Sequence, residues 1–274
     1  MDVRTYLEQQ QVHPQLIRAV EEFRNQYPVE EKVKYRVSDP MMPFYGTEIL
    51  EMGIAALLQK ENLLLSGSKA TGKNVLAENL AWIFQRPTYN ISFHVNTGSG
   101  DLIGTDTFED NQVKLRKGSI YQCAEYGGFG ILDEINMAKN DAVSVLHATL
   151  DYRRSIDVPG YDKIELHPAA RFIGTMNYGY AGTKELNEAL VSRFLVIQMP
   201  DQNEETLEKI FTTSFPEGKP EAIEQFIGLS GSAKKSGERR NIHKSSGSSR
   251  NPCFVAGDPP GTETVSGCED GCDQ

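Results

Sequence analysis

A glycine-rich stretch between an apolar segment and a helical pattern places the tightest constraint on the fold of this chain. Residues 67–74, GSKATGKN, follow directly on the apolar run NLLLS at 62–66. They have the G-x-x-x-x-G-K spacing of a loop that cradles phosphate groups. Backbone N–H groups of such a loop and the positive end of the following helix hold phosphates, and a lysine adds a point charge. The stretch therefore predicts a strand, a phosphate-binding loop and a helix in direct succession.

The candidate phosphate-binding residues are the whole loop and the start of the helix after it: Gly67, Ser68, Lys69, Ala70, Thr71, Gly72, Lys73, Asn74 and Val75. Asn74 departs from the pattern, because this position normally carries a Ser or Thr whose hydroxyl binds Mg²⁺. An amide carbonyl is still a hard oxygen ligand, so Asn74 stays a candidate Mg²⁺ ligand and we expect lowered activity rather than lost binding. The structural alternative is a glycine-rich turn with an ordinary surface lysine.

Apolar strand patterns alternate with helical patterns through the first 200 residues. The expected strands lie at 62–66, 88–94, 129–133, 171–177 and 194–200, and the clearest helical patterns at 47–59, 72–86 and 143–150. Such alternation implies a parallel sheet covered by helices on both faces. Turn residues between short apolar pieces predict hairpins within 99–120 and 155–172. Apolar spacing before residue 24 predicts one or two amphipathic helices laid on the main domain.

Composition narrows the class of protein. The chain has 274 residues, a formal net charge of −10 and a sequence pI near 5.1, which argues against a general nucleic-acid or membrane-surface binder. No stretch has a signal-peptide pattern or the length of a membrane span, so we expect a cytoplasmic protein. Residues 230–274 are rich in Ser, Gly and Pro and are expected to be disordered. Of four cysteines only Cys123 precedes this tail, and we expect plain thiols.

Two neighbouring acids end the apolar pattern at 129–133. A carboxylate at the end of a strand beside the phosphate-loop strand can hold Mg²⁺ through its water shell, which we expect of Asp133. Glu134, one residue further, would orient and polarise an attacking water as a general base. The alternative is a solvated acidic pair at a strand end.

Two further polar residues follow later strand and helix patterns. Asn177 ends the pattern at 171–177, where its amide could hold the water or a phosphate opposite Glu134, or could simply form a turn. Arg193 lies at the end of LNEALVSRF, residues 186–194. It is either a charge at a helix C-terminus or a finger that points into a neighbouring subunit's nucleotide, since its planar fork suits the charge of phosphoryl transfer.

In this order and spacing, the loop at 67–74, ILDEIN at 131–136, GTMN at 174–177 and LNEALVSRF resemble the AAA+ ATPases. Within them they resemble the MoxR-like branch that includes CbbQ- and NorQ-type proteins. The resemblance covers about residues 40–200 and implies Walker A at 67–74, Walker B at Asp133 and Glu134, sensor 1 at Asn177 and an arginine finger at Arg193.

The resemblance also implies a fold. We expect an α/β P-loop NTPase with a five-stranded parallel sheet of order 5-1-4-3-2 flanked by helices. Tyr45 and Gly46, after Phe44, resemble the segment that lines the adenine in relatives. The implied cofactors are ATP and Mg²⁺, with Asn74 and Asp133 as the metal ligands. The two hairpins resemble family insertions that face the pore or the client.

We therefore divide the chain into an N-terminal helical extension at 1–40, the nucleotide-binding domain at 41–200, a partial helical lid at 201–229 and the tail from 230. The lid is shorter than in relatives, and Arg239 and Arg240 in the tail are assigned no role. The expected function is ATP hydrolysis by a homo-oligomeric ring, expected to be a hexamer, that remodels or activates a client protein, with a von Willebrand factor A domain protein as the implied partner. The alternative is a nucleotide-gated assembly module with little turnover, favoured by Asn74 and the short lid.

Overall fold

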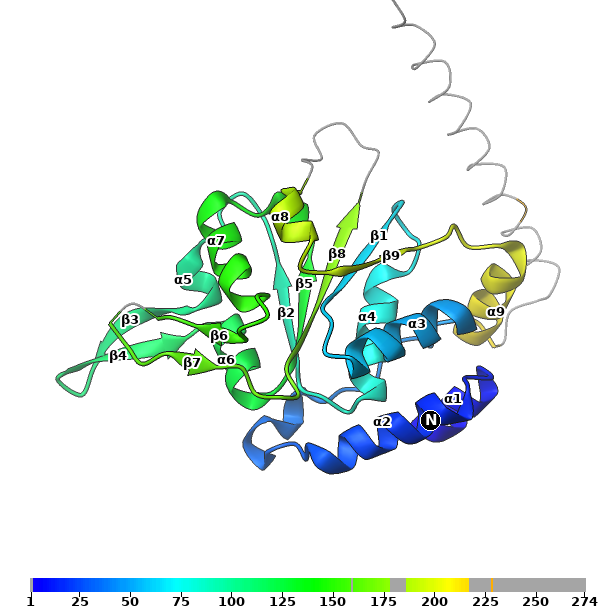
Figure 1. Ribbon diagram of the computed structural model, residues 1–274. Coiled ribbons are helices and arrows are strands. Elements are labelled where there is room, and N and C mark those ends of the chain that lie inside the picture. The colour runs from blue at the N-terminus through cyan, green and yellow to red at the C-terminus, as the bar shows by residue number, and fades with distance from the viewer. Residues whose placement is uncertain (1, 159, 178–185, 217–227, 229–274) are drawn as a thin grey trace, which may run out of the picture. The chain divides into compact units, whose positions relative to one another are not determined.

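Five parallel strands form the central sheet, and the strand that leads into the glycine-rich loop lies inside it. The computed structural model describes residues 2–158, 160–177, 186–216 and 228. The sheet order is β2-β5-β8-β1-β9, and all pairings are parallel (Figure 1). The predicted order 5-1-4-3-2 is therefore confirmed. The strands are β1 (Leu63–Gly67), β2 (Thr88–Ser92), β5 (Phe129–Asp133), β8 (Arg171–Asn177) and β9 (Leu195–Gln198).

Each face of the sheet packs on its own apolar core, because successive side chains of a strand point to opposite faces. Leu63 and Leu65 belong to one core and Leu64 to the other. The first core is completed by α3 (Thr47–Leu58) and α4 (Lys73–Ile83), and the second by α5 (Ser99–Leu102), α6 (Ser119–Tyr126) and α7 (Asn140–Thr149). Figure 1 shows these two groups of helices on either side of the strands.

The N-terminal segment forms two helices, α1 (Val3–Gln9) and α2 (Pro14–Gln26), followed by the 3-10 helix η1 (Glu31–Arg36). Pro14 occupies the first position of α2, where its missing N–H costs nothing. Arg86, which is 1% exposed, donates to the carbonyls of Tyr27, Tyr126 and Gly127 at 2.6, 3.0 and 2.7 Å. One buried guanidinium thus satisfies the C-terminal ends of α2 and α6 together and fixes the extension to the domain.

Both predicted hairpins are present. One pairs β3 (Gly104–Glu109) with β4 (Gln112–Lys117), and the other pairs β6 (Ser155–Ile156) with β7 (Ile164–Glu165). Figure 1 shows β3 and β4 reaching away from the sheet beside β6 and β7. The Tyr161 hydroxyl donates to Asp106 at 2.7 Å and ties the two hairpins together.

Most expected elements end within two or three residues of the observed ones. The helix expected at 72–86 ends at Ile83, because Gln85 has a φ of +50° and reverses the chain. The remaining elements are η2 (Ile135–Met137), α8 (Glu188–Val191) and α9 (Glu204–Ser214). The helix α8 lies in the helix predicted before Arg193 and α9 lies in the predicted lid, whereas the sequence did not predict α6. No helix within the described ranges is long and apolar enough to cross a membrane.

The described residues up to 216, with the N-terminal helices and α9, belong to one compact unit, and everything discussed below lies in it. Several expectations lie outside the described residues: the second lid helix, the character of the tail, and the states of Cys253, Cys268 and Cys272. Cys123 is a buried free thiol. The proposed domain boundaries remain predictions.

Candidate nucleotide site

The glycine-rich loop connects the end of β1 to the start of α4, as the sequence predicted. Gly72 is the N-cap of α4 with a φ of +85°, a conformation that side chains with a Cβ rarely adopt. A Cβ on Gly67 would lie 3.0 Å from the Cβ of Met199 and 3.1 Å from its carbonyl oxygen. The Thr71 hydroxyl closes the loop by donating to the Ser68 carbonyl at 3.0 Å. Glycine is therefore favoured by the backbone conformation at Gly72 and by the tight contact with Met199 at Gly67.

Lys73 lies inside this loop and is 7% exposed. Its ammonium donates to the carbonyls of Gly67 and Ser68 at 3.1 and 2.5 Å and to the Thr71 hydroxyl at 3.3 Å. Burial lowers the pKa of Lys73, and the charge of Asp133 works in the opposite direction. Three contacts thus hold the Lys73 ammonium against the loop.

The acidic pair lies at the end of β5, which pairs directly with β8. The expectation that the acids end a strand beside the loop strand is wrong, because β8 lies between β5 and β1. Asp133 is half-buried, and its Oδ1 accepts from the Thr175 hydroxyl at 2.5 Å. Glu134 is exposed and has a φ of +53°, the left-handed region that residues other than glycine seldom enter. Its backbone N–H donates to the same Thr175 hydroxyl at 3.3 Å. Thr175 was not among the residues predicted from sequence.

Asn177 ends β8 and is directly paired in register with Gly67, the first residue of the loop. In the neighbouring ladder Leu132 pairs with Gly174, so the ends of β5, β8 and β1 meet at one edge of the sheet. Asp133, Asn177 and the loop therefore lie at the same edge of the sheet. In the sequence, more than 40 residues separate the loop from Asp133, and more than 40 separate Asp133 from Asn177. The carboxyl edge of a parallel sheet is the usual place for a ligand in such folds.

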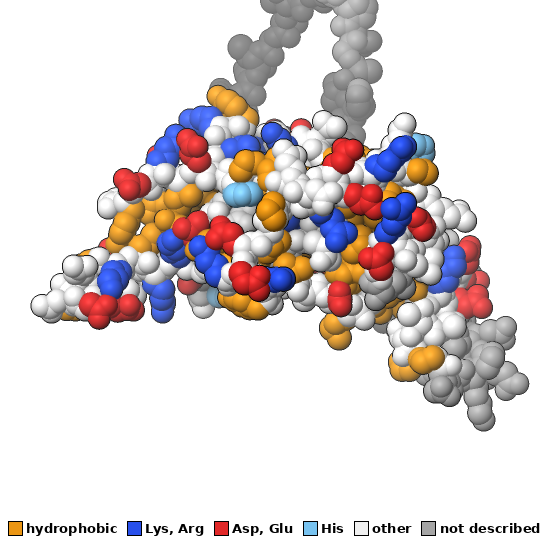
Figure 2. Space-filling view, turned by 90° about the horizontal axis from the view of Figure 1, so that it is seen from below, with side chains coloured by type: hydrophobic (Ala, Val, Ile, Leu, Met, Phe, Trp, Pro, Cys, Tyr) orange, Lys and Arg blue, Asp and Glu red, His pale blue; other side chains and the backbone are white. Residues whose placement is uncertain are grey.

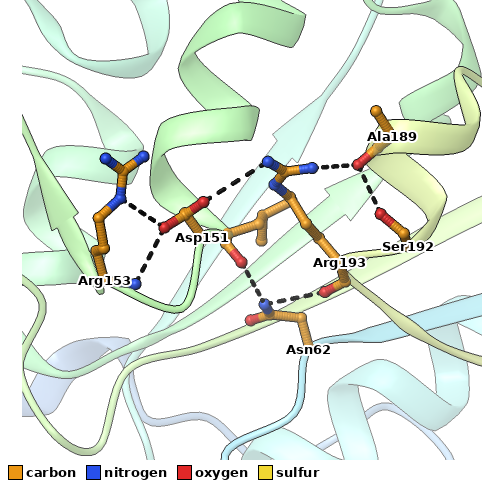
Figure 3. A network of polar contacts seen from close by, with 7 residues as sticks. Asn62, Asp151, Arg153, Ala189, Ser192 and Arg193 are labelled. Atoms are coloured by element: carbon orange, nitrogen blue, oxygen red, sulfur yellow. Dashed lines mark hydrogen bonds and ion pairs between the residues drawn. The ribbon is translucent and has the colours of Figure 1, made fainter.

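Arg193 does not join this group. Its carbonyl and that of Leu150 accept from the amide of Asn62, the residue before β1, at 3.3 and 3.4 Å. Gly67 lies at the other end of β1, about 15 Å away at the rise of an extended strand. The guanidinium lies 3.6 Å from Asp151 and donates to the Ala189 carbonyl (Figure 3). Asp151 also accepts from the Arg153 guanidinium at 2.8 Å, so one carboxylate serves two arginines.

A pocket of about 300 Å³ opens beside the loop. Tyr45 and Gly46 line it together with Phe44, where the sequence placed the adenine contacts. The Tyr45 hydroxyl lies 2.7 Å from that of Thr213, which connects this segment to α9. The sequence missed the opposite wall, which comes from the segment after β9 and from α9: Met199, Pro200, Asp201, Gln202, Asn203, Thr206 and Ile210.

The donor set suits Mg²⁺. Asp133 offers a carboxylate oxygen, and Asn74, in the first turn of α4, is exposed and offers an amide oxygen. In the part of the chain that the structure describes, no group of three or more His, Cys, Asp or Glu side chains could hold a metal ion. Mg²⁺ is commonly bound by one or two side-chain oxygens, with substrate phosphates and water completing its shell.

Comparison with known families agrees with this geometry. Residues 62–194 match the family described as AAA domain (dynein-related subfamily). This stretch of the chain is therefore similar to AAA domains. The match runs from the residue before β1 to the residue before β9 and so spans the loop, both acids, Asn177 and Arg193.

The chain is also similar in sequence to individual bacterial proteins. The chain is 33% identical over 187 residues to the uncharacterized protein YojN of Bacillus subtilis, covering 66% of this chain and 62% of YojN. It is 34% identical over 145 residues to an uncharacterized protein of Staphylococcus saprophyticus, covering 51% of this chain and 55% of the relative. The chain therefore spans less than two thirds of the length of these relatives.

A crystal structure of a candidate ATPase from Cytophaga hutchinsonii is similar with a TM-score of 0.51 and 19% identity. The alignment covers 72% of this chain and 55% of that one. At this identity the likeness shows the fold alone.

Proposed function

We propose that this protein hydrolyses ATP as a ring-forming AAA+ protein of the MoxR-like kind and uses the energy to remodel or activate a client protein. The observation that carries the proposal is the meeting of three strand ends. The loop with Lys73, the acids at the end of β5 and Asn177 share one edge of the sheet, and an apolar pocket opens beside the loop. A protein that only bound nucleotide would need no acid in the position of Glu134.

The roles follow from the positions. Loop N–H groups and Lys73 bind the β- and γ-phosphates, and the pocket beside Tyr45 and Gly46 accepts the adenine. Glu134 is exposed at this edge and can take a proton from a water aligned with the γ-phosphate, while the Asn177 amide holds that water or the phosphate. Asp133 and Asn74 would hold Mg²⁺, which neutralises charge that develops on the phosphate oxygens.

Ring assembly is part of the proposal because Arg193 lies at the opposite end of β1 from its own loop. In a ring, an arginine there would serve the nucleotide of another subunit. In a homo-oligomeric ring, proposed to be a hexamer, each Arg193 would contact the γ-phosphate of the ATP bound to the neighbouring subunit. There it would stabilise the negative charge of the transition state.

The partner follows from the resemblance to the MoxR-like branch, whose members commonly work with von Willebrand factor A domain proteins. We propose a client of this kind, contacted by the two hairpins, and a cytoplasmic site of action. Nucleic acid is a poor candidate, since the net charge is −10. Figure 2 shows Lys and Arg side chains interspersed with Asp and Glu on the face seen from below, so the basic side chains do not form one continuous patch on that face.

A nucleotide-gated assembly module with little turnover is the second candidate. Asn74 favours it, because an amide at the first turn of α4 replaces the usual hydroxyl ligand. The two candidates differ in whether γ-phosphate is released.

The test is Glu134→Gln, which keeps the shape of the side chain and removes the base. The variant should bind ATP with unchanged affinity, release phosphate at least about 100-fold more slowly and remain assembled in ATP. Phosphate release and size-exclusion chromatography in ATP measure both properties. A variant that hydrolyses ATP at the parent rate would show that Glu134 is not the base.

A further inference from the structure

The hydroxyl of Thr175 lies between the two acids that the proposed reaction needs. It donates to Oδ1 of Asp133 at 2.5 Å and accepts the backbone N–H of Glu134 at 3.3 Å. A threonine hydroxyl has one proton to donate and lone pairs to accept with, so both contacts can be made at once. Thr175 itself is buried, with 2% of its surface exposed.

The sheet itself fixes Thr175 in this place. Thr175 lies in the middle of the sheet on β8 and is paired in register with Leu65 of the loop strand, while β8 pairs with the acid strand on its other side. The residue that ends β8, two positions on, is Asn177. A β-branched residue on a central strand has little rotamer freedom, so the hydroxyl is held in one orientation.

Glu134 needs such an anchor more than an ordinary residue does. Its φ of +53° is strained for a side chain with a Cβ, and such a conformation persists only where neighbours hold it. Thr175 holds its N–H, and the Met137 N–H donates to its carbonyl at 2.8 Å. The two contacts fix the backbone at Glu134 and so the direction in which its carboxylate leaves the strand end.

We propose that Thr175 is the positioning residue of this site. Its hydroxyl occupies one oxygen of Asp133, which orients the carboxylate so that the other oxygen serves Mg²⁺, and it anchors the backbone of Glu134 in its left-handed conformation. Thr175 touches neither the substrate nor the reacting atoms and acts only through the two acids. This inference rests on the proposed function, because both acids have their roles only if the site binds Mg²⁺ and ATP.

Thr175→Val tests the idea, because valine keeps the shape of threonine and removes only the hydroxyl. Thr175→Ser is the matched variant that keeps the hydroxyl and removes the methyl group. We expect the valine variant to lose about 10–100-fold in kcat, the usual cost of removing a partner of a metal ligand, while its KM for ATP changes little. The serine variant should retain most of the parent's kcat. Thermal unfolding of both variants reports whether they fold, and Thr175→Ala replaces the valine variant if valine does not fold.

A second readout does not require turnover. Mn²⁺ titrations followed by electron paramagnetic resonance, in the presence of the non-hydrolysable analogue AMP-PNP, report how well Asp133 is oriented. Mn²⁺ should bind about tenfold more weakly to the valine variant than to the parent or the serine variant. If the parent binds Mn²⁺ with AMP-PNP but releases no phosphate, hydrolysis as the proposed function fails while the role of Thr175 at Asp133 is still measured.

Two outcomes would overturn the proposal. One is a valine variant that matches the parent in both kcat and Mn²⁺ affinity, which would make the hydroxyl irrelevant to the acids. The other is a serine variant as impaired as the valine variant, which would assign the effect to packing of the methyl group.

Discussion

Replacing Arg86 with methionine should destabilise the protein, because the guanidinium satisfies three carbonyls and is almost fully buried. Methionine fills much of the same space but donates no hydrogen bond. Each carbonyl that loses its donor costs about 1 kcal/mol, so we expect a loss of about 3 kcal/mol in the free energy of unfolding. In a domain of this size 1 kcal/mol corresponds to about 2–4 °C in Tm, and the expected drop is about 6–12 °C.

Circular dichroism during thermal unfolding measures the drop, and Arg18→Met is the control because Arg18 is an exposed residue of the same N-terminal helix that Arg86 anchors. Hydrogen exchange in α2 should also accelerate in the Arg86 variant, since Tyr27 at the end of that helix loses its partner. A Tm within about 2 °C of the Arg18 variant would refute the reasoning. It would mean that the cost of burying the guanidinium cancels what its hydrogen bonds contribute.

Two further predictions concern the site, and a third concerns a histidine near Arg86. Arg193→Ala should lower ATP turnover in the assembled protein by at least about 10³-fold and leave ATP affinity of the monomer unchanged by calorimetry; a large loss of monomer affinity would place the arginine in its own site. Asn74→Thr should raise turnover and lower the Mg²⁺ concentration needed for half-maximal rate if the amide is the poorer ligand, and unchanged Mg²⁺ dependence would show that it serves equally well. Burial and the nearby Arg86 lower the pKa of His167. The unfolded chain therefore takes up a proton first as pH falls below about 6.5, and stability should decrease from there downward. Tm measured between pH 7.5 and 5 should fall less in His167→Gln than in the parent, and identical pH profiles would contradict the assignment.

The sequence predicted those parts of the fold that depend on the order of neighbouring residues. The loop at 67–74 has fixed spacing, the strand at 129–133 is an apolar run that is buried as far as Leu132, and turn residues mark both hairpins. The order of the strands came from the family resemblance. The short helix α6 was missed because its few apolar residues lie between a hairpin and a strand.

The parts that could not be predicted depend on residues that meet only in the folded chain. Thr175 reads as an ordinary strand residue, and nothing local shows that its hydroxyl faces Asp133. Arg86 reads as a surface charge, although it is 1% exposed. The wall of the pocket formed by Gln202 and Ile210 joins a segment more than 150 residues earlier in the chain. The spacing of residues in the sequence does not indicate such long-range contacts.

The most direct test of the account is Mg²⁺-dependent phosphate release per subunit, measured over a series of protein concentrations with Glu134→Gln beside the parent. The account predicts a rate per subunit that rises with concentration as rings form, because each site needs Arg193 from a neighbour, and that vanishes in the variant. Tight ATP binding with no phosphate release at any concentration would contradict it.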